Sequence, residues 1–216
     1  MGDRQGFSRR HVLELAAIGG LAMVTGARAA AEATLGKPHI ERFDPALDAI
    51  LSPDQPIMEL ATGFGGGGNT EGPVWWHEGG FLLFSSIGDE KVIKYTPGQG
   101  TSVYRERTHG ANGHARDMQG RLVSCEGLTR RVTREEKDGS TTVVCNSYQG
   151  KRINKPNDVV VKSDGSVYFT DPWNIPDLPQ PWDLDYNGVY RVSPDLGTVN
   201  LLTRDLILPN GLAFSP

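Results

Sequence analysis

The sequence predicts an all-β protein of the β-propeller type, with about four blades present. Between residues 74 and 216, apolar residues fall in short runs bounded by Gly, Asp and Pro, which is typical of a sheet-rich chain. A unit with a polar first residue, an Asp and Gly turn and a closing β-rich run also recurs along the chain. Its first residues, here named the openers, are Glu71, Asn112, Asn157 and Asn210. Their spacings of 41, 45 and 53 residues lie around the roughly 40–50 residues of a four-stranded propeller blade.

The clearest copy of this unit spans residues 157–171. Two β-rich runs flank a Ser-Asp-Gly-Ser turn at residues 163–166, which predicts a hairpin. Pro156 fixes its own backbone and restricts the residue before it. Asn157 and Asp158 are therefore expected at the start of a rigid strand.

The remaining strands are expected in runs that alternate basic and apolar residues. Middle strands of the blades are predicted at residues 91–95, 130–134 and 188–192, and outer strands at residues 141–144 and 199–202. The net charge is −4, and aromatic residues do not interleave with the basic ones. These runs therefore indicate solvated sheet faces, and no nucleic-acid partner is expected.

Residues 1–30 have the pattern of an export signal. Arg9 and Arg10 form a twin-arginine motif, followed by a small apolar stretch through Val24 and a small-residue cleavage signal at residues 27–31. The apolar stretch is shorter than the roughly 20 residues of a spanning helix, which disfavours a retained anchor. We expect a bacterial periplasmic or secreted protein with no membrane contact after cleavage. The alternative is a basic amphipathic helix in a cytosolic protein.

A lead-in segment at residues 31–70 is expected before the propeller at residues 71–216. An Asp-Pro start and the spacing of apolar residues predict a short helix within residues 43–51. The glycine run at residues 65–68 lacks the lysine and the strand-before, helix-after context of a nucleotide-binding loop. We interpret it as a flexible loop near the mouth of the channel.

Radial symmetry would bring the openers together. Equivalent positions in successive blades surround one central channel, so one carboxylate and several amide oxygens would meet there. Such an all-oxygen set suits a hard cation such as Ca²⁺ and does not suit zinc, which would require His or Cys. The alternative for any single Asn or Asp is a local turn at the start of a strand.

Six motifs together carry a family resemblance. They are Glu71-Gly72-Pro73 and the runs at residues 119–126, 155–166, 168–172, 187–191 and 209–216. In combination they resemble the gluconolactonase and senescence-marker-protein (regucalcin) family, over residues 60–216. The resemblance implies a six-bladed propeller that binds one divalent metal, usually calcium, in its channel. It also implies lactonase or related ester hydrolase activity.

The resemblance further implies roles for the openers. Glu71, Asn157 and Asn210 match the metal ligands of the family. Asn112 opens a blade whose opener is not a ligand there, so it is expected to face the substrate or to be structural. A remaining Asp ligand, which is the leading candidate for the general base, would lie one blade beyond Pro216.

Other polar residues close to the openers are candidates for catalysis and substrate binding. Asp158 is the catalytic candidate, either beside the ligands or as acceptor for a substrate hydroxyl. Lys155 is expected to hold a sugar hydroxyl. Asp171 is expected to bind substrate or to act as a strand-end hydrogen-bond partner. His114 could shuttle protons in the channel, although a satisfied core or rim histidine is the stronger interpretation.

Two further features complete the predicted organisation. Cys125 and Cys145 lie in β-rich runs and make no disulfide framework, and no Cys/His constellation indicates thiol catalysis. The Pro- and Trp-rich insertion at residues 172–182 follows a strand end, where it could be a lid over the channel mouth or a stiff connector.

The predicted function is calcium-dependent hydrolysis of a sugar lactone by Lewis-acid activation. About four blades cannot close a six-bladed ring, so we expect a C-terminally truncated form with open edge strands that allow self-association. The alternative is a catalytically inactive propeller that serves as a sugar-binding or assembly module.

Overall fold

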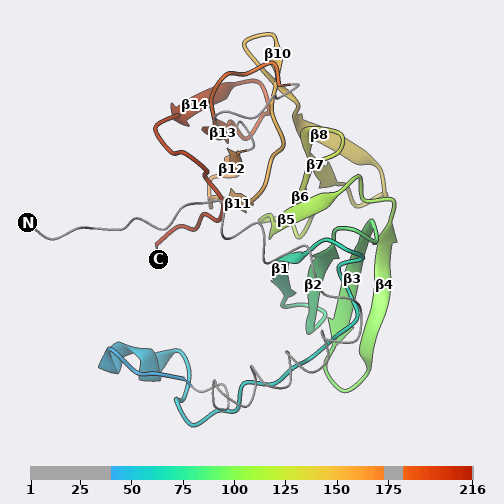
Figure 1. Ribbon diagram of the computed structural model, residues 1–216, viewed down its shortest axis with the longest axis vertical. Helices are drawn as coiled ribbons and strands as arrows, with labels where there is room; N and C mark the ends of the chain where they lie inside the picture. Colours follow the sequence, from blue (N-terminus) through green and yellow to red (C-terminus); the bar gives the residue numbers. More distant parts are fainter. Residues whose placement is uncertain (1–39, 173–181, 216) are drawn as a thin grey trace, which may run out of the picture. The chain divides into compact units, whose positions relative to one another are not determined.

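The computed structural model describes residues 40–172 and 182–215 of the chain (Figure 1). These residues belong to two units, residues 1–59 and residues 60–216. The predicted export signal and nearly all of the insertion at residues 172–182 lie outside the described residues. Within the described residues, no helix is long and apolar enough to cross a membrane.

In the first unit, the helix predicted within residues 43–51 is a short 3-10 helix, η1 (Pro45–Ala49). The carboxylate of Asp44 accepts the backbone N–H of Ala46 at 2.7 Å and caps its start. The predicted apolar face is not buried, because Phe43 is 91% exposed and Ile50 is 80% exposed. The helical spacing therefore predicted the position of the helix correctly. The apolar residues of that pattern do not pack against a core, and the helix is a 3-10 helix.

The second unit contains three four-stranded antiparallel sheets, each a propeller blade with its strands in chain order. Blade 1 is β1 (Thr70–Trp76), β2 (Phe81–Ser86), β3 (Lys91–Thr96) and β4 (Gly100–Glu106). Blade 2 is β5 (Ala111–Arg116), β6 (Leu122–Glu126), β7 (Arg131–Glu135) and β8 (Thr141–Cys145). Blade 3 is β11 (Val159–Val161), β12 (Val167–Asp171), β13 (Gly188–Val192) and β14 (Val199–Thr203). A two-stranded ribbon, β9 (Ser147–Tyr148) and β10 (Lys151–Arg152), leads from blade 2 to blade 3.

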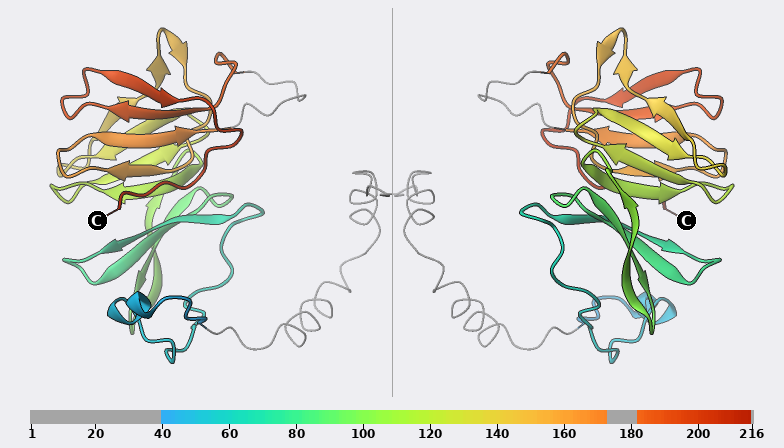
Figure 2. Two further views of the ribbon diagram at one scale, coloured as in Figure 1. Left: turned by 90° about the vertical axis from the view of Figure 1, so that its left-hand side faces the viewer. Right: turned by 90° about the vertical axis from the view of Figure 1, so that its right-hand side faces the viewer.

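The blades are arranged radially. Strand β5 contacts both β1 and β11, so the first strands of the three blades lie next to one another. Figure 1 shows these first strands gathered together, with β4, β8 and β14 at the outside, and Figure 2 shows the sheets from the side. The all-β propeller fold and the predicted middle and outer strands are confirmed.

The number of blades differs from the expected four. Three complete blades are present in the described residues, and the copy that begins at Asn210 forms no strand up to residue 215. Counting openers therefore overestimated the number of blades. An opener marks where a blade would begin, but it does not show that four strands follow and pair.

The three blades share one register, so the repeat is structural as well as sequential. The pairs Leu83–Lys94, Val123–Arg134 and Tyr168–Arg191 are equivalent pairs between second and third strands. The first strands of blades 1 and 2 carry a bulge that starts beside the opener. A bulge changes the direction of a side chain relative to the regular ladder. Here the bulges lie between Glu71 and Val74 and between Ala111 and His114.

Two glycines permit the close approach of neighbouring openers. Gly72 has φ +58°, and a Cβ there would lie 2.2 Å from the backbone oxygen of Asn112. A Cβ on Gly113 would lie 2.3 Å from the carboxylate of Asp158 and 2.6 Å from the backbone oxygen of Asn157. The opener-Gly pairs of the sequence thus follow from backbone packing between successive blades.

Apolar side chains fix each blade against the next. One core cluster combines buried residues of blade 2, such as Val132, with Phe169 and Tyr190 of blade 3. The rings of Phe169 and Tyr190 stack with centroids 5.1 Å apart. A second cluster joins Leu83 of blade 1 to Leu122 of blade 2. Each fully buried side chain of this size contributes about 1.5–3 kcal/mol, so these contacts hold the openers in place.

The glycine run does not form the flexible loop near the channel mouth that the sequence suggested. The backbone N–H of Gly65 donates to the Ser86 hydroxyl at 2.7 Å, and the N–H of Gly88 donates to the Gly65 carbonyl at 2.9 Å. A Cβ on Gly88 would lie 2.3 Å from that carbonyl. The glycines allow the loop to pack against the turn between β2 and β3, and none of them lines the central cavity described below.

Candidate functional site

The four openers line one cavity of about 360 Å³ where the first strands of the blades meet. The cavity receives one opener from each of the three blades and a fourth, Asn210, from the segment after β14. The residues that follow these openers complete most of its wall. The structure therefore brings together side chains that are up to 139 residues apart in sequence, as the repeat predicted.

Glu71, Asn157 and Asn210 line this cavity, and their side chains make no hydrogen bond to another described residue. Asn157 is only 6% exposed, so its amide is nearly removed from water. No group of three or more His, Cys, Asp and Glu side chains suited to a metal occurs in the parts of the chain that are described. One carboxylate with neutral amide oxygens instead fits a hard cation such as Ca²⁺.

Asp158 lies in the wall of the same cavity. Its carboxylate accepts the backbone N–H of Val159 at 2.9 Å and that of Leu212 at 3.3 Å. Burial raises the pKa of this half-buried carboxyl, and the two backbone donors oppose the rise. Asp158 thus contacts the cavity as a fixed carboxyl group whose affinity for a proton is increased.

Side-chain hydroxyls connect successive blades at the cavity. Ser85, the second-last residue of β2, donates to the carbonyl of opener Asn112 at 2.8 Å. Thr170, the second-last residue of β12, donates in the same way to the carbonyl of opener Asn210 at 2.7 Å. In blade 2 the equivalent residue is Cys125, and the carbonyl of opener Asn157 instead accepts the N–H of Gly113 at 2.8 Å.

Thr170 therefore joins the two halves of the candidate site. Its hydroxyl accepts the backbone N–H of Asp158 at 3.1 Å while it donates to Asn210, and the side chain is only 2% exposed. Its backbone carbonyl also accepts the N–H of Asn157 at 2.9 Å. One residue on β12 thus sets the position of two predicted ligands and the catalytic candidate.

His114 is a satisfied core histidine, in agreement with the stronger interpretation of the sequence. Its Nε2 lies 2.7 Å from the hydroxyl of Ser85, and its Nδ1 lies 2.8 Å from that of Ser124. Because the Ser85 hydroxyl donates to Asn112, it accepts from Nε2–H, and Nδ1 accepts from Ser124. Burial lowers the pKa of His114 to about 3. The imidazole is neutral near pH 7 and both its nitrogens are engaged, so it is not a proton shuttle.

Two predicted substrate contacts, Asp171 and Lys155, are not in the wall of the cavity. Asp171 is 0% exposed, and its Oδ2 accepts the backbone N–H of Asn154 at 2.7 Å. The structure does not bring Asp171 into the cavity wall, and its alternative as a strand-end hydrogen-bond partner agrees with the geometry. Asp171 is the last residue of β12, and its carboxylate accepts the N–H of Asn154. This hydrogen bond anchors the segment that leads to Asn157.

The burial of Asp171 predicts a pH-dependent stability. Burial raises its pKa to about 7 from the ordinary value of 3.8, and the Oδ1 atom has no hydrogen-bond partner in the described residues. A raised folded-state pKa stabilises the native state below about pH 4, and this contribution is lost as the pH rises through about 7. The free energy of unfolding should fall by up to about 4 kcal/mol over this range.

The measurement is chemical denaturation between pH 4 and 8 for the wild type and for Asp171→Asn. Because other carboxyl groups titrate in both proteins, the expected result is a difference in slope, with the decline smaller in the variant. Identical pH slopes would contradict a neutral, buried Asp171.

Cys125 and Cys145, for which the sequence predicted no disulfide framework, are free and buried. Cys125 and Cys145 pair with Val132 from its two sides, so a strand separates them. Burial raises the pKa of Cys145 to about 11, and burial also raises the pKa of Cys125 well above its ordinary value. Both thiols are therefore protonated near neutral pH, which argues against thiol catalysis.

The sequence analysis missed Ser85 and Thr170, although a signal was present. The two hydroxyl residues occupy the same position of the repeat, one residue before the last in the second strand of a blade. Hydroxyl groups at an equivalent buried position indicate a shared backbone acceptor. The identity of that acceptor could not be read, because it lies in the following blade.

The fold and the cavity define a class of β-propeller protein with an oxygen-lined central site. Residues 69–216 match the family described as SMP-30/Gluconolactonase/LRE-like region, and the chain belongs to this family. A gluconolactonase of Zymomonas mobilis is 35% identical over 238 residues, an alignment that covers 100% of this chain and 65% of that protein.

Solved structures agree with this assignment. A gluconolactonase from Xanthomonas campestris matches with a TM-score of 0.57 at 34% identity, covering 62% of this chain and 47% of that one. A structural genomics target proposed to be a gluconolactonase matches with a TM-score of 0.65 at 33% identity, covering 74% and 56% of the two chains. The chain thus spans less than two thirds of the length of these relatives.

Proposed function

We propose that this chain takes part in the metal-dependent hydrolysis of a sugar lactone. The observation that carries the proposal is the convergence of Glu71, Asn157, Asn210 and Asp158 on one cavity. The relatives described as gluconolactonases supply the reaction class. A lactone hydrolase requires a group that stabilises charge on the carbonyl oxygen and a group that manages a proton.

Glu71, Asn157 and Asn210 are the residues that would hold a divalent cation, for which we propose calcium. A single carboxylate with neutral amides would leave most of the charge of the ion uncompensated. When bound, the cation would supply Lewis acidity toward the lactone carbonyl.

The remaining polar residues would position the substrate and handle the proton. Asp158, with its raised pKa, is suited to accept a hydrogen bond from a substrate hydroxyl or to take up a proton during the reaction. Asn112 lines the same wall, and its amide can bond a sugar hydroxyl. The neutral imidazole of His114 holds Ser85, and through it the backbone of Asn112.

The test is hydrolysis of glucono-1,5-lactone by the full chain, followed as acid release. We expect turnover that is abolished by a chelator and restored by calcium. Turnover that is unaffected by chelation would contradict the metal-dependent mechanism. A folded chain without turnover at saturating calcium would contradict lactonase activity of this polypeptide.

A further inference from the structure

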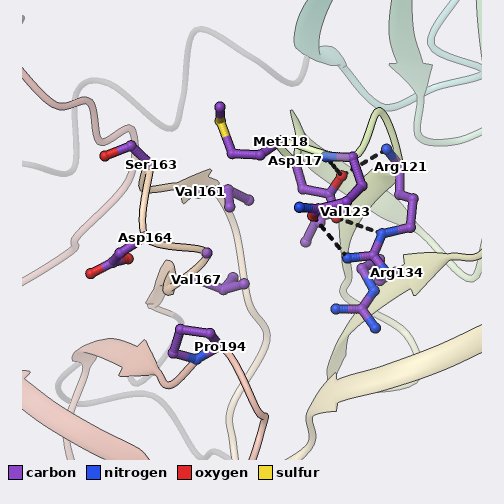
Figure 3. A pocket seen from close by; sticks show the side chains of 12 residues that line it. Asp117, Met118, Arg121, Val123, Arg134, Val161, Ser163, Asp164, Val167 and Pro194 are labelled. Carbon is purple, nitrogen blue, oxygen red and sulfur yellow. Dashed lines mark hydrogen bonds and ion pairs between the residues drawn. The ribbon is translucent and has the colours of Figure 1, made fainter.

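A second cavity, of about 300 Å³, lies between blades 2 and 3 at the end of the strands opposite the openers (Figure 3). Strand β5 begins beside opener Asn112 and ends just before Asp117, which lines the second cavity. Four apolar residues belong to its lining: Val123, Val161, Val167 and Pro194. Val161 and Pro194 keep accessible surface, whereas Val123 and Val167 are buried. This volume is at the lower end of the roughly 300–1,000 Å³ of small-molecule sites.

Arg134 is the polar group that sets the chemistry of this cavity. Its Nε donates to Glu136 at 2.7 Å, and no described residue accepts a hydrogen bond from its two terminal nitrogens. The side chain is only 16% exposed. Figure 3 marks no hydrogen bond or ion pair between Arg134 and the other residues that line the cavity. A part-buried guanidinium, held at Nε, presents a planar pair of donors that matches a carboxylate.

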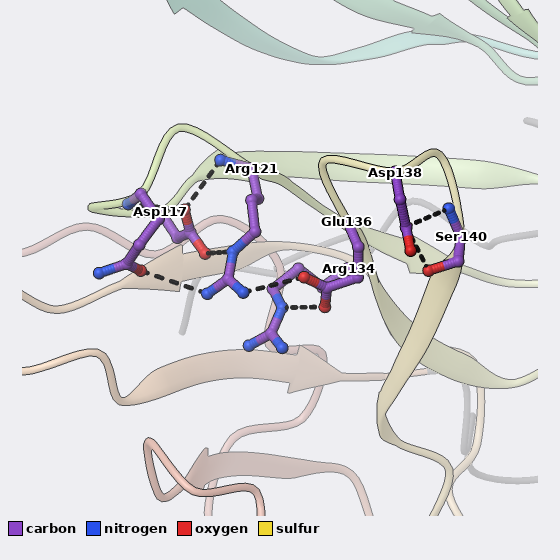
Figure 4. A network of polar contacts seen from close by, with 7 residues as sticks. Asp117, Arg121, Arg134, Glu136, Asp138 and Ser140 are labelled. Carbon is purple, nitrogen blue, oxygen red and sulfur yellow. Dashed lines mark hydrogen bonds and ion pairs between the residues drawn. The ribbon is translucent and has the colours of Figure 1, made fainter.

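The surrounding charges leave this pair of donors available. Arg121 donates to Asp117 at 2.7 Å and to Glu136 at 2.9 Å, so the nearer carboxylates are engaged (Figure 4). The hydrogen bond from Arg134 lowers the pKa of Glu136 to about 2, which keeps this anchor ionised. The carboxylate of Asp164 accepts the N–H of Ser166 and points away from Arg134 (Figure 3).

The repeat provides an internal comparison. Lys94, Arg134 and Arg191 are the fourth residues of the third strands of blades 1, 2 and 3. Lys94 lies 4.2 Å from the centre of the Phe81 ring, and a terminal nitrogen of Arg191 donates to Ser166 at 2.8 Å. Of these three equivalent cations, Arg134 is the one that lines the second cavity. The position of Arg134 is thus shared by all three blades, and what distinguishes it is that it lines a cavity with its terminal nitrogens unbonded.

We propose that the cavity between blades 2 and 3 binds a small organic carboxylate, with Arg134 holding the carboxylate and the accessible parts of Val161 and Pro194 contacting a short apolar tail. The site is separate from the opener cavity and does not depend on the lactonase proposal.

The test is titration of the ¹⁵N-labelled full chain with sodium butyrate, followed by amide chemical shifts, with and without added calcium chloride. We expect saturable shifts at Gln119 and Gly165, which line the cavity, with a Kd on the order of 1 mM. Butyramide, which has the same size and no charge, should bind roughly tenfold more weakly or not at all. Calcium should leave the affinity unchanged.

Variants distinguish binding in the cavity from a general attraction of butyrate to positive surface charge. Arg134→Gln should weaken butyrate binding roughly tenfold or more, and Arg134→Lys, which keeps the charge without the planar fork, should also weaken it. Arg191→Gln is the matched control and should bind as the wild type does. The spectra themselves show whether each variant is folded. Equal affinity of Arg134→Gln and the wild type, equal binding of butyramide, or shifts confined to the opener cavity would overturn the proposal.

Discussion

Substitution of Glu71 by Gln is expected to weaken calcium binding and lactone hydrolysis by about 100-fold or more. Glu71 is the carboxylate among the three proposed ligands, and the change removes its charge while keeping its size. Even changes to groups that only support a metal ligand cost about 10–100-fold in affinity or activity. The measurements are calorimetric titration with calcium and the rate of glucono-1,5-lactone hydrolysis.

Glu78→Gln is the matched control for this prediction. Glu78 lies just after the same strand, β1, pairs with Arg116 and does not line the opener cavity. It should retain the wild-type calcium affinity and rate, because exposed ion pairs contribute little. Equal losses in both variants would indicate a general electrostatic effect and not a ligand.

The second large effect is expected for Thr170→Val. The change removes the hydroxyl that bonds both the backbone N–H of Asp158 and the carbonyl of Asn210, with little change of volume. An unsatisfied buried polar group costs about 1–3 kcal/mol, so we expect a loss of stability of that order. Calcium affinity should fall by about tenfold, because two proposed ligands lose their common connection.

Two further variants determine whether the hydroxyl is responsible. Thr170→Ser keeps the hydroxyl and should restore most of the calcium affinity. Thr108→Val removes an equally buried hydroxyl that has no partner among the described residues, and it should change neither affinity nor stability appreciably. Thr170→Ser and Thr170→Val with the same affinity would contradict a role of this hydrogen bond in positioning the site.

Much of the fold was predictable because the propeller repeats locally. The hairpin around residues 163–166 follows from β-branched runs and turn chemistry, and the structure pairs Val161 with Val167 across this turn. The convergence of the openers followed from symmetry, since equivalent positions of a repeat share one height around the axis. Both features can be predicted from short stretches of sequence together with the radial symmetry of a propeller.

The parts that could not be predicted depend on contacts between blades. Asp171 and Glu126 are both the last residues of second strands, yet Asp171 holds the segment before Asn157 whereas Glu126 accepts from Thr129, Arg131 and Thr133 within its own blade. The sequence shows that Asp171 and Glu126 occupy equivalent positions of the repeat, but it does not show that they have different hydrogen-bond partners. The glycine run was misinterpreted for the same reason, because close packing of backbones has no local signature.

The most direct test of the central claim is an anomalous difference map from crystals of the full chain grown with calcium. We predict one peak in the opener cavity, about 2.3–2.6 Å from side-chain oxygens of Glu71, Asn157 and Asn210. A peak at any other place, or a calcium-saturated crystal with no peak between these three residues, would contradict the assignment of the site.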